Sequence, residues 1–338
     1  MRKEKEYRER CAARGLDASA LGAAVAAVEA LEARAREGGA EGECIPLALA
    51  ESHVADLVAS GQASEERIMA LARYFAVLGE DQKAIRLLAY LLPIGVLPAM
   101  AKRIAELEGE AHRDRIMSRV AIPPAGSPPE AYPAATKAFL AALESELGTE
   151  GAKRILKWNV HGIPAAAFAE ERDFFLAAPS LDAWLVGQHE RQVAVLARHA
   201  ESGKLWFEQK ITSRVVEFVR SNPEICGGRR EGRFIYATKI PYDPDRWLGS
   251  ADPVERRRLA CHCPFAASAI AASANGDGVS PLWCSCSAGY EKVMYDAVFG
   301  TETECEVLES VLSGGERCRF AIRIPESVPL FREAGVAP

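Results

Sequence analysis

The pattern of apolar and polar positions divides the chain into a helical first part and a mixed last part. Apolar residues recur every three or four positions through 16–36, 46–60 and 64–78, with charged residues between them, as in amphipathic helices. The same spacing returns in five further stretches: 134–147, 151–160, 163–176, 181–201 and 207–221. Between the two helical regions, 121–133 holds five prolines. Because proline lacks an N–H donor and fixes φ, this segment predicts a linker.

After Gly228 the sequence changes from helical spacing to segments typical of strands, in which apolar and polar residues alternate. The segment 232–241 is rich in aromatic and β-branched residues and predicts a strand, and 287–299 predicts a helix that Gly300 ends. Alternating segments at 304–312 and 317–324, with the turn residues Ser-Gly-Gly-Glu between them, predict an antiparallel hairpin. We therefore predict an α+β protein. Its parts are a helical domain at 1–120, the linker at 121–133, a domain at 134–325 that runs from helices into the hairpin, and a tail at 326–338.

Strand periodicity singles out one carboxylate in this hairpin. Cys318, Phe320 and Ile322 share the face that should be buried, and a four-residue turn places Glu309 opposite Phe320 on that face. A buried carboxylate is costly unless it is neutralised or paired. We therefore expect Glu309 to serve as a catalytic acid or base, or to meet a metal or a cationic substrate.

Composition and charge limit the classes of molecule that the protein is expected to bind. The chain of 338 residues is 49% hydrophobic and has a formal net charge of -6, which argues against nucleic acid and anionic lipid as partners. The longest apolar run, 89–101, is interrupted by two prolines and is too short to span a bilayer. The charged first residues precede no apolar signal segment, so we expect a cytoplasmic protein. The helical domain is interpreted as a packing or dimerisation domain, and in the second case the protein would be a homodimer.

The cysteines mark where the chemistry should lie. Four of the nine form two Cys-x-Cys pairs, Cys261–Cys263 and Cys284–Cys286, and Cys318 follows on a predicted strand. Thiolates are metal ligands and nucleophiles, and the start of the 287–299 helix would lower the pKa of Cys286. We expect these five cysteines to bind zinc, with iron or no metal as alternatives. In the metal-free alternative, Cys286 is the nucleophile and Glu309 or His262 assists it.

A resemblance to known families adds to this interpretation. The stretch SCSAGYEKVMYDAVFG…CEVLESVLSGGERCRFAIRIP resembles the C-terminal core of the 4-vinyl reductase-like small-molecule-binding domains, and is similar to L-2-amino-thiazoline-4-carboxylate hydrolase-like proteins. Cys286, Glu309 and Cys318 match the vinyl-reductase-like pattern, whereas Leu312 replaces a cysteine that holds zinc in sensors of that family. Cys261 or Cys263 could replace that ligand. The longer run ICGG…TKIPY…CHCPF…CSCSAGY also looks like a group of uncharacterised bacterial proteins.

Two functions follow from these observations. The first is a hydrolase for a small nitrogen- or sulfur-containing substrate such as a cyclic amidine or thioether, with Glu309, Cys286 and His262 as catalytic residues. Lys239, Tyr242 and Tyr290 are then the candidates for substrate binding. The second is a small-molecule-binding module of the vinyl-reductase-like kind, in which zinc is structural.

Overall fold

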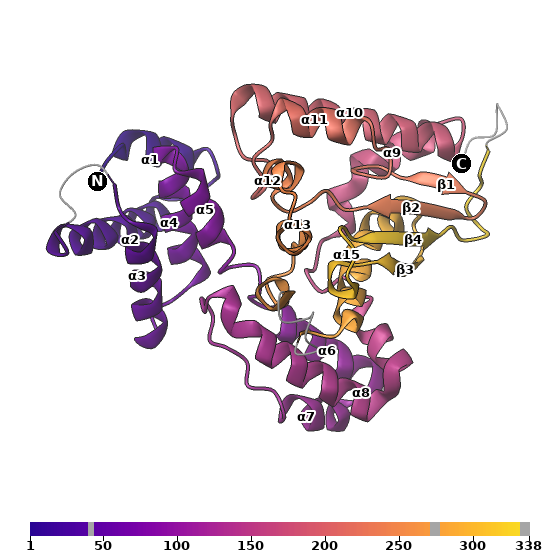
Figure 1. Cartoon of the computed structure of the whole chain (residues 1–338), viewed down its shortest axis with the longest axis horizontal. Helices are drawn as coiled ribbons and strands as arrows, with labels where there is room; N and C mark the ends of the chain where they lie inside the picture. The colour runs from indigo at the N-terminus through magenta and orange to yellow at the C-terminus, as the bar shows by residue number, and fades with distance from the viewer. Residues whose placement is uncertain (40–43, 271–277, 332–338) are drawn as a thin grey trace. The chain divides into compact units, whose positions relative to one another are not determined.

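The computed structural model describes residues 1–39, 44–270 and 278–331, and the chain forms two compact units (Figure 1). The first unit consists of 1–94 and 122–132, and the second of 95–121 and 133–338. This division differs from the expected helical domain at 1–120 and linker at 121–133. Residues 95–120 belong to the second unit, and most of the proline-rich segment belongs to the first.

The first unit is a group of helices around its own core. Its helices are α1 (Glu4–Ala12), α2 (Ala18–Glu37), α3 (Leu47–Ala59), α4 (Glu65–Leu78) and α5 (Asp81–Leu88). Ser64 begins α4 as an N-cap, because its Oγ accepts a hydrogen bond from the Arg67 amide at 3.3 Å. The apolar stripes of these helices meet in one cluster that includes Tyr7, Leu31, Leu71, Phe75 and Leu87.

The proline-rich segment packs against this unit. Gly126, at φ +83°, approaches the side chains of Ile68 and Val58 so closely that a Cβ would lie 2.9 Å from Ile68. A short 3₁₀ helix, η1 (Pro129–Ala131), follows, and Glu130 forms a two-pronged ion pair with Arg86 of α5 at 2.9 and 3.0 Å. Residues 121–128 contain no helix or strand, as predicted, but the contacts of Gly126 and Glu130 hold the segment against the first unit.

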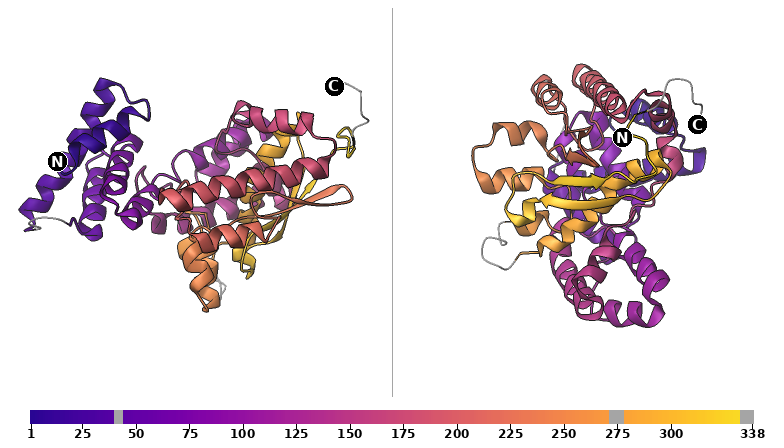
Figure 2. Two further views of the ribbon diagram at one scale, coloured as in Figure 1. Left: turned by 90° about the horizontal axis from the view of Figure 1, so that it is seen from above. Right: turned by 90° about the vertical axis from the view of Figure 1, so that its right-hand side faces the viewer.

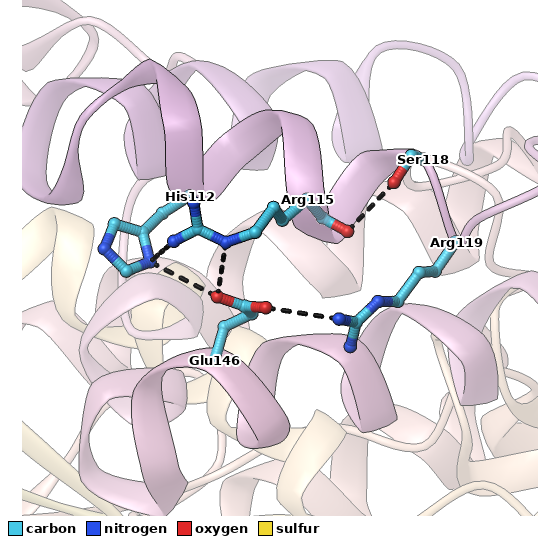
Figure 3. A network of polar contacts seen from close by, with 5 residues as sticks. All are labelled: His112, Arg115, Ser118, Arg119 and Glu146. Atoms are coloured by element: carbon cyan, nitrogen blue, oxygen red, sulfur yellow. Dashed lines mark hydrogen bonds and ion pairs between the residues drawn. The ribbon is translucent and has the colours of Figure 1, made fainter.

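The second unit begins with helices. They are α6 (Val96–Glu108), α7 (Glu110–Met117), α8 (Tyr132–Leu156, interrupted at Gly148), η2 (Ala165–Phe168), α9 (Ala169–Ala177), α10 (Leu181–Ser202) and α11 (Ser213–Arg220). Glu146 of α8 fastens the end of α7: it accepts hydrogen bonds from Arg115 at 2.9 Å and Arg119 at 3.2 Å (Figure 3). The same Arg115 donates to His112 Nδ1 at 2.9 Å.

A small antiparallel sheet completes the second unit and confirms the α+β class. Its strands are β1 (Arg229–Glu231), β2 (Phe234–Thr238), β3 (Glu304–Glu309) and β4 (Arg319–Arg323), in the order β1-β2-β4-β3 (Figure 1). Figure 2 gives two further views of the ribbon. One face is buried and carries Ile235, Ala237, Cys305, Phe320 and Ile322. Gly228 allows close packing on this face, because a Cβ there would lie 2.5 Å from Ile235 and 3.0 Å from the Tyr295 hydroxyl.

Short helices lie between the strands, and Cys284 and Cys286 are within two of them. They are α12 (Pro244–Gly249), α13 (Pro253–Ala260), η3 (Ala267–Ala269), η4 (Pro281–Cys284), α15 (Ser285–Phe299) and η5 (Val311–Ser313). The predicted helix at 287–299 is therefore present as α15, and Gly300 ends it at φ +69°. The beginning of the expected tail is tied down, since Arg233 donates to the carbonyls of Pro325 and Val328 at 3.0 Å; 332–338 lie outside the described residues.

The hairpin differs from its prediction at Glu309, the residue expected to be a buried carboxylate. Val307 pairs with Phe320, but a β-bulge follows, so that Glu309 pairs with Arg319 instead. Beyond Glu309 the chain turns into η5 rather than continuing as a strand to 312. The prediction of a buried Glu309 is wrong, because the extra residue of the bulge turns this side chain to the exposed side, where it accepts a hydrogen bond from the Glu316 amide at 3.0 Å.

Within the described part of the chain, no helix has both the length and the apolar character needed to cross a membrane.

Candidate functional site

Lys239 lies at the centre of the candidate site, directly after strand β2. Its amide donates to the Cys318 carbonyl at 2.9 Å, so the two residues lie side by side at the end of the β2–β4 pair. The Lys239 ammonium donates to Ser287 Oγ at 2.8 Å and lies 4.7 Å from the ring centroid of Tyr290. The sheet thus places one cation against the first turns of α15, and a cation–π contact with Tyr290 favours it there.

The first Cys-x-Cys pair reaches the same region from the end of α13. The His262 ring donates from Nε2 to the Ile240 carbonyl at 2.6 Å and packs edge-on against Tyr242, with ring centroids 5.4 Å apart. Because a carbonyl only accepts, Nε2 carries the proton and Nδ1 is the basic nitrogen of the neutral ring. Trp283 Nε1 donates to Cys263 Sγ at 3.1 Å and so joins the first pair to the segment that bears the second.

The charge of Lys239 acts on most of these groups. Burial, followed by the Lys239 charge, lowers the pKa of His262 to about 4. Burial raises the pKa of Cys286 to about 12, with Cys263 adding to this effect and Lys239 opposing it. The expectation that the start of the helix would lower this pKa is therefore wrong, because the effect of burial is larger. Burial also raises the pKa values of Cys263 and Cys318, again against the effect of Lys239. At neutral pH the site therefore contains a neutral imidazole and protonated thiols around one ammonium group.

Glu291 is a carboxylate of this site that sequence reasoning missed. It lies on α15 one turn after Ser287, is partly exposed, and has its pKa raised by burial while Lys239 opposes the shift. Its charge also acts on Cys318 and on Cys226, and burial raises the pKa of Cys226 to about 12. The i, i+4 spacing of Ser287 and Glu291 behind Cys286 was the signal available in the sequence.

Cys226 is a further residue that the sequence did not indicate. It precedes Gly227 and adopts φ +57°, a left-handed conformation that is strained for a residue with a Cβ. Strained non-glycine residues concentrate at functional sites, since the surrounding structure must hold them in place.

The structure thus brings together Lys239, Tyr290 and His262 with Cys263, Cys286 and Cys318. Tyr242 joins through His262. Cys261 and Cys284 are buried behind these residues; burial raises the pKa of Cys284 to about 12 and that of Cys261 well above its ordinary value. Of the expected site residues, Glu309 and Tyr290 lie exposed. Tyr290 still contacts the Lys239 ammonium, whereas the carboxylate on which the Lys239 charge acts is Glu291.

The five cysteines expected to bind zinc lie in one region of the second unit. They are close enough for charge on one to raise the pKa of another, as Cys318 does for Cys284. Nevertheless, among the residues that the structure describes, no group of three or more His, Cys, Asp or Glu side chains could hold a metal ion. The Cys263 sulfur also accepts the Trp283 hydrogen bond. Zinc remains a prediction from the cysteine spacing.

Comparison with known proteins gives one local match. Residues 257–328 match a family of unknown function (DUF6144). The matched segment includes both Cys-x-Cys pairs, Glu291 and Cys318, whereas Lys239 precedes it. No curated protein and no solved structure matches the chain. The relation to vinyl-reductase-like and hydrolase-like proteins stays a prediction.

Proposed function

We propose that the second unit is a hydrolase for a small nitrogen- or sulfur-containing substrate that carries an anionic group. The observation that carries the proposal is that the charge of the Lys239 ammonium acts on both the Cys286 thiol and the Glu291 carboxyl. Cys286 and Glu291 are partly exposed, and both have pKa values that burial raises and Lys239 lowers. Perturbed titratable groups around one cation are typical of catalytic sites.

Lys239 is suited to bind the anionic group. Ser287 and Tyr290 hold its ammonium in place while using a neutral hydroxyl and a ring face, so its positive charge is not neutralised by either contact. Within the described residues, no ion pair of Lys239 with a carboxylate is present. A substrate carboxylate would supply the counter-charge.

Glu291 would move the proton. As Cys286 Sγ forms a bond to the electrophilic carbon, the thiol proton passes to the Glu291 carboxylate, and from there to the nitrogen or sulfur that leaves. Water then attacks the covalent intermediate. Glu291 takes a proton from that water as the carbon–sulfur bond breaks, and returns it to the Cys286 sulfur, so that the net reaction adds one water to the substrate. The nearby ammonium would stabilise the thiolate character that develops on Cys286.

The second function is a small-molecule-binding module without catalysis, and the protonation of the thiols favours it. Burial raises the pKa of Cys263, Cys284, Cys286 and Cys318 alike, and protonated thiols are weak nucleophiles. In that alternative the unit binds a small anionic molecule at Lys239 without reacting with it.

The two functions are separated by assay of a panel of cyclic amidines and thioethers that carry one carboxylate, with release of thiol or ammonia as the signal. For the hydrolase we expect Glu291→Gln to lower kcat by about 10²–10⁴-fold while substrate binding persists. Glu309→Gln is the matched control and should turn over normally. Binding without turnover in the unsubstituted protein would favour the binding module, and normal turnover by Glu291→Gln would remove Glu291 from the mechanism.

The zinc prediction has its own test. We expect elemental analysis of protein purified without chelator or metal-affinity resin to find about one equivalent of zinc if the Cys-x-Cys pairs bind it, and less in Cys263→Ser and Cys286→Ser variants. Protein free of metal, yet folded and reactive toward alkylating reagents, would instead favour cysteine chemistry.

A further inference from the structure

A cavity of about 430 Å³ lies beside the C-terminal half of α15. The α15 residues that line it begin at Lys292, after the residues that contact Lys239, so the cavity is distinct from the candidate site. Helix α6 and the segment after α8 supply its other walls. The lining residues used below are Arg103, Trp158, Asn159, Lys292, Val293 and Glu302.

Arg103 is the unsatisfied group of this cavity. Its Nε is buried and, within the described part of the chain, has no hydrogen-bond partner. The guanidinium lies over the Trp158 ring, 5.3 Å from the centroid. Such stacking uses the face of the guanidinium and leaves its edge, with the N–H donors, available to an acceptor. A buried donor without an acceptor is costly, which points to a ligand.

The other charged groups of the cavity, and the Asn159 amide, already have partners. The Lys292 ammonium binds Asp296 and Glu302, each at 2.9 Å. The Asn159 side chain closes on its own loop, since it donates to the Ile163 carbonyl at 2.8 Å and accepts from the Ile163 amide at 3.0 Å. Arg103 is therefore the lining cation whose charge is not balanced by a neighbour among the described residues.

We propose that this cavity binds a small organic monocarboxylate with a flat, apolar body. The carboxylate would accept two parallel hydrogen bonds from the Arg103 edge, a geometry that guanidinium matches well. The body would lie against Trp158 and Val293, and the cavity volume is in the range of small-molecule sites. Asp296 and Glu302 also line the cavity and disfavour dianions such as phosphate more strongly than monoanions, since like charges repel.

In the test, benzoate is titrated into the full chain, and isothermal titration calorimetry measures its binding. Benzamide, its neutral isostere, and inorganic phosphate are the comparison ligands. We expect benzoate to bind saturably and both comparison ligands to bind at least tenfold more weakly. Arg103→Gln should weaken benzoate binding at least tenfold. The matched control is Lys102→Gln, which removes one positive charge from an exposed position of the same helix and should leave binding unchanged.

A second readout needs no change at Arg103. Benzoate should shift the indole N–H resonance of Trp158, which a Trp158→Phe variant assigns. The proposal is overturned if benzoate does not bind the unsubstituted protein, if benzamide or phosphate binds as tightly, if a folded Arg103→Gln variant binds benzoate as before, or if the Trp158 resonance does not move.

Discussion

At the scale of single residues, the charge of Lys239 acts on several titratable groups of the candidate site. One ammonium group, held by Ser287 and Tyr290, opposes the effect of burial on the pKa values of Cys263, Cys286, Cys318 and Glu291. It adds to the effect of burial on the pKa of His262, because a cation disfavours a second cation nearby. The same charge should attract an anionic reagent.

Alkylation of Cys286 measures this attraction. We expect Lys239→Gln to lower the ratio of the iodoacetate rate to the iodoacetamide rate by about fivefold, since an interaction of about 1 kcal/mol between charges 4 Å apart in water is lost. Peptide mass analysis assigns the rates to Cys286, and Lys204→Gln, at an exposed lysine of the same unit, is the control. An unchanged ratio would mean that Lys239 does not face the Cys286 thiol.

Cys284 links protonation to stability. Burial raises its pKa from 9.0 to about 12, so above about pH 9 the unfolded chain loses a proton that the folded chain keeps. The unfolded state then binds fewer protons, and the free energy of unfolding falls as pH rises, by about 1.4 kcal/mol per pH unit for this thiol. Urea denaturation between pH 9 and 10.5 should show a shallower fall in Cys284→Ala. Equal slopes in the two proteins would contradict the assignment.

At the scale of elements, α15 organises the second unit. Its first turns meet Lys239, and its later turns line the Arg103 cavity. Gly289, between these parts, lets the helix approach the segment that follows α8. A Cβ at this position would lie 2.4 Å from the Trp158 amide nitrogen and 2.5 Å from the Trp158 carbonyl oxygen.

Replacement of Gly289 tests this close contact. We expect Gly289→Ala to lower the free energy of unfolding of the second unit by about 1–3 kcal/mol, because backbone atoms must move to admit the methyl group. Chemical denaturation measures the change. Gly249→Ala is the control, since a Cβ there comes no closer than 3.7 Å to the Arg214 guanidinium, and it should change stability by less than about 0.5 kcal/mol. Similar stabilities for the two variants would show that α15 does not need this approach.

At the scale of the whole molecule, the chain builds two units with separate cores. The first unit is closed by the return of 122–132, after the chain has contributed 95–121 to the second. Its core contains Leu71 and Phe75, whereas the site described above lies wholly within the second unit.

Separate cores predict separate responses to a core substitution. We expect Leu71→Ala to destabilise the first unit by about 2–5 kcal/mol, since Leu71 is 1% exposed and its truncation leaves a cavity. Calorimetry of the full chain should show two unfolding transitions, of which only that of the first unit moves to lower temperature. The alkylation rate of Cys286 should not change. A single transition, or a changed Cys286 rate, would show that the units unfold as one.

Local pattern alone was enough to predict much of this protein. Helices, the strand before Lys239, the helix after the second Cys-x-Cys pair and the existence of the hairpin all follow from periodicities of 3.6 and 2, which depend on neighbours in the chain. The cysteine spacing likewise directed attention to the region where Lys239, Tyr290 and His262 meet. Each of these features depends on residues that are close in sequence.

The features that local pattern could not supply arise from contacts between distant segments. One extra residue at the β-bulge moved the Glu309 side chain from the expected buried face of the sheet to the exposed face, because a shift of a single position changes the face of a strand residue. Glu291 became part of the site only when the end of β2 met α15, and Arg103 gained its cavity only when α6 met the segment after α8. The amino-acid sequence by itself therefore determined the elements and the chemistry available to them. Only the tertiary structure decided which of those groups share a site, because burial and charge act between atoms that folding brings together.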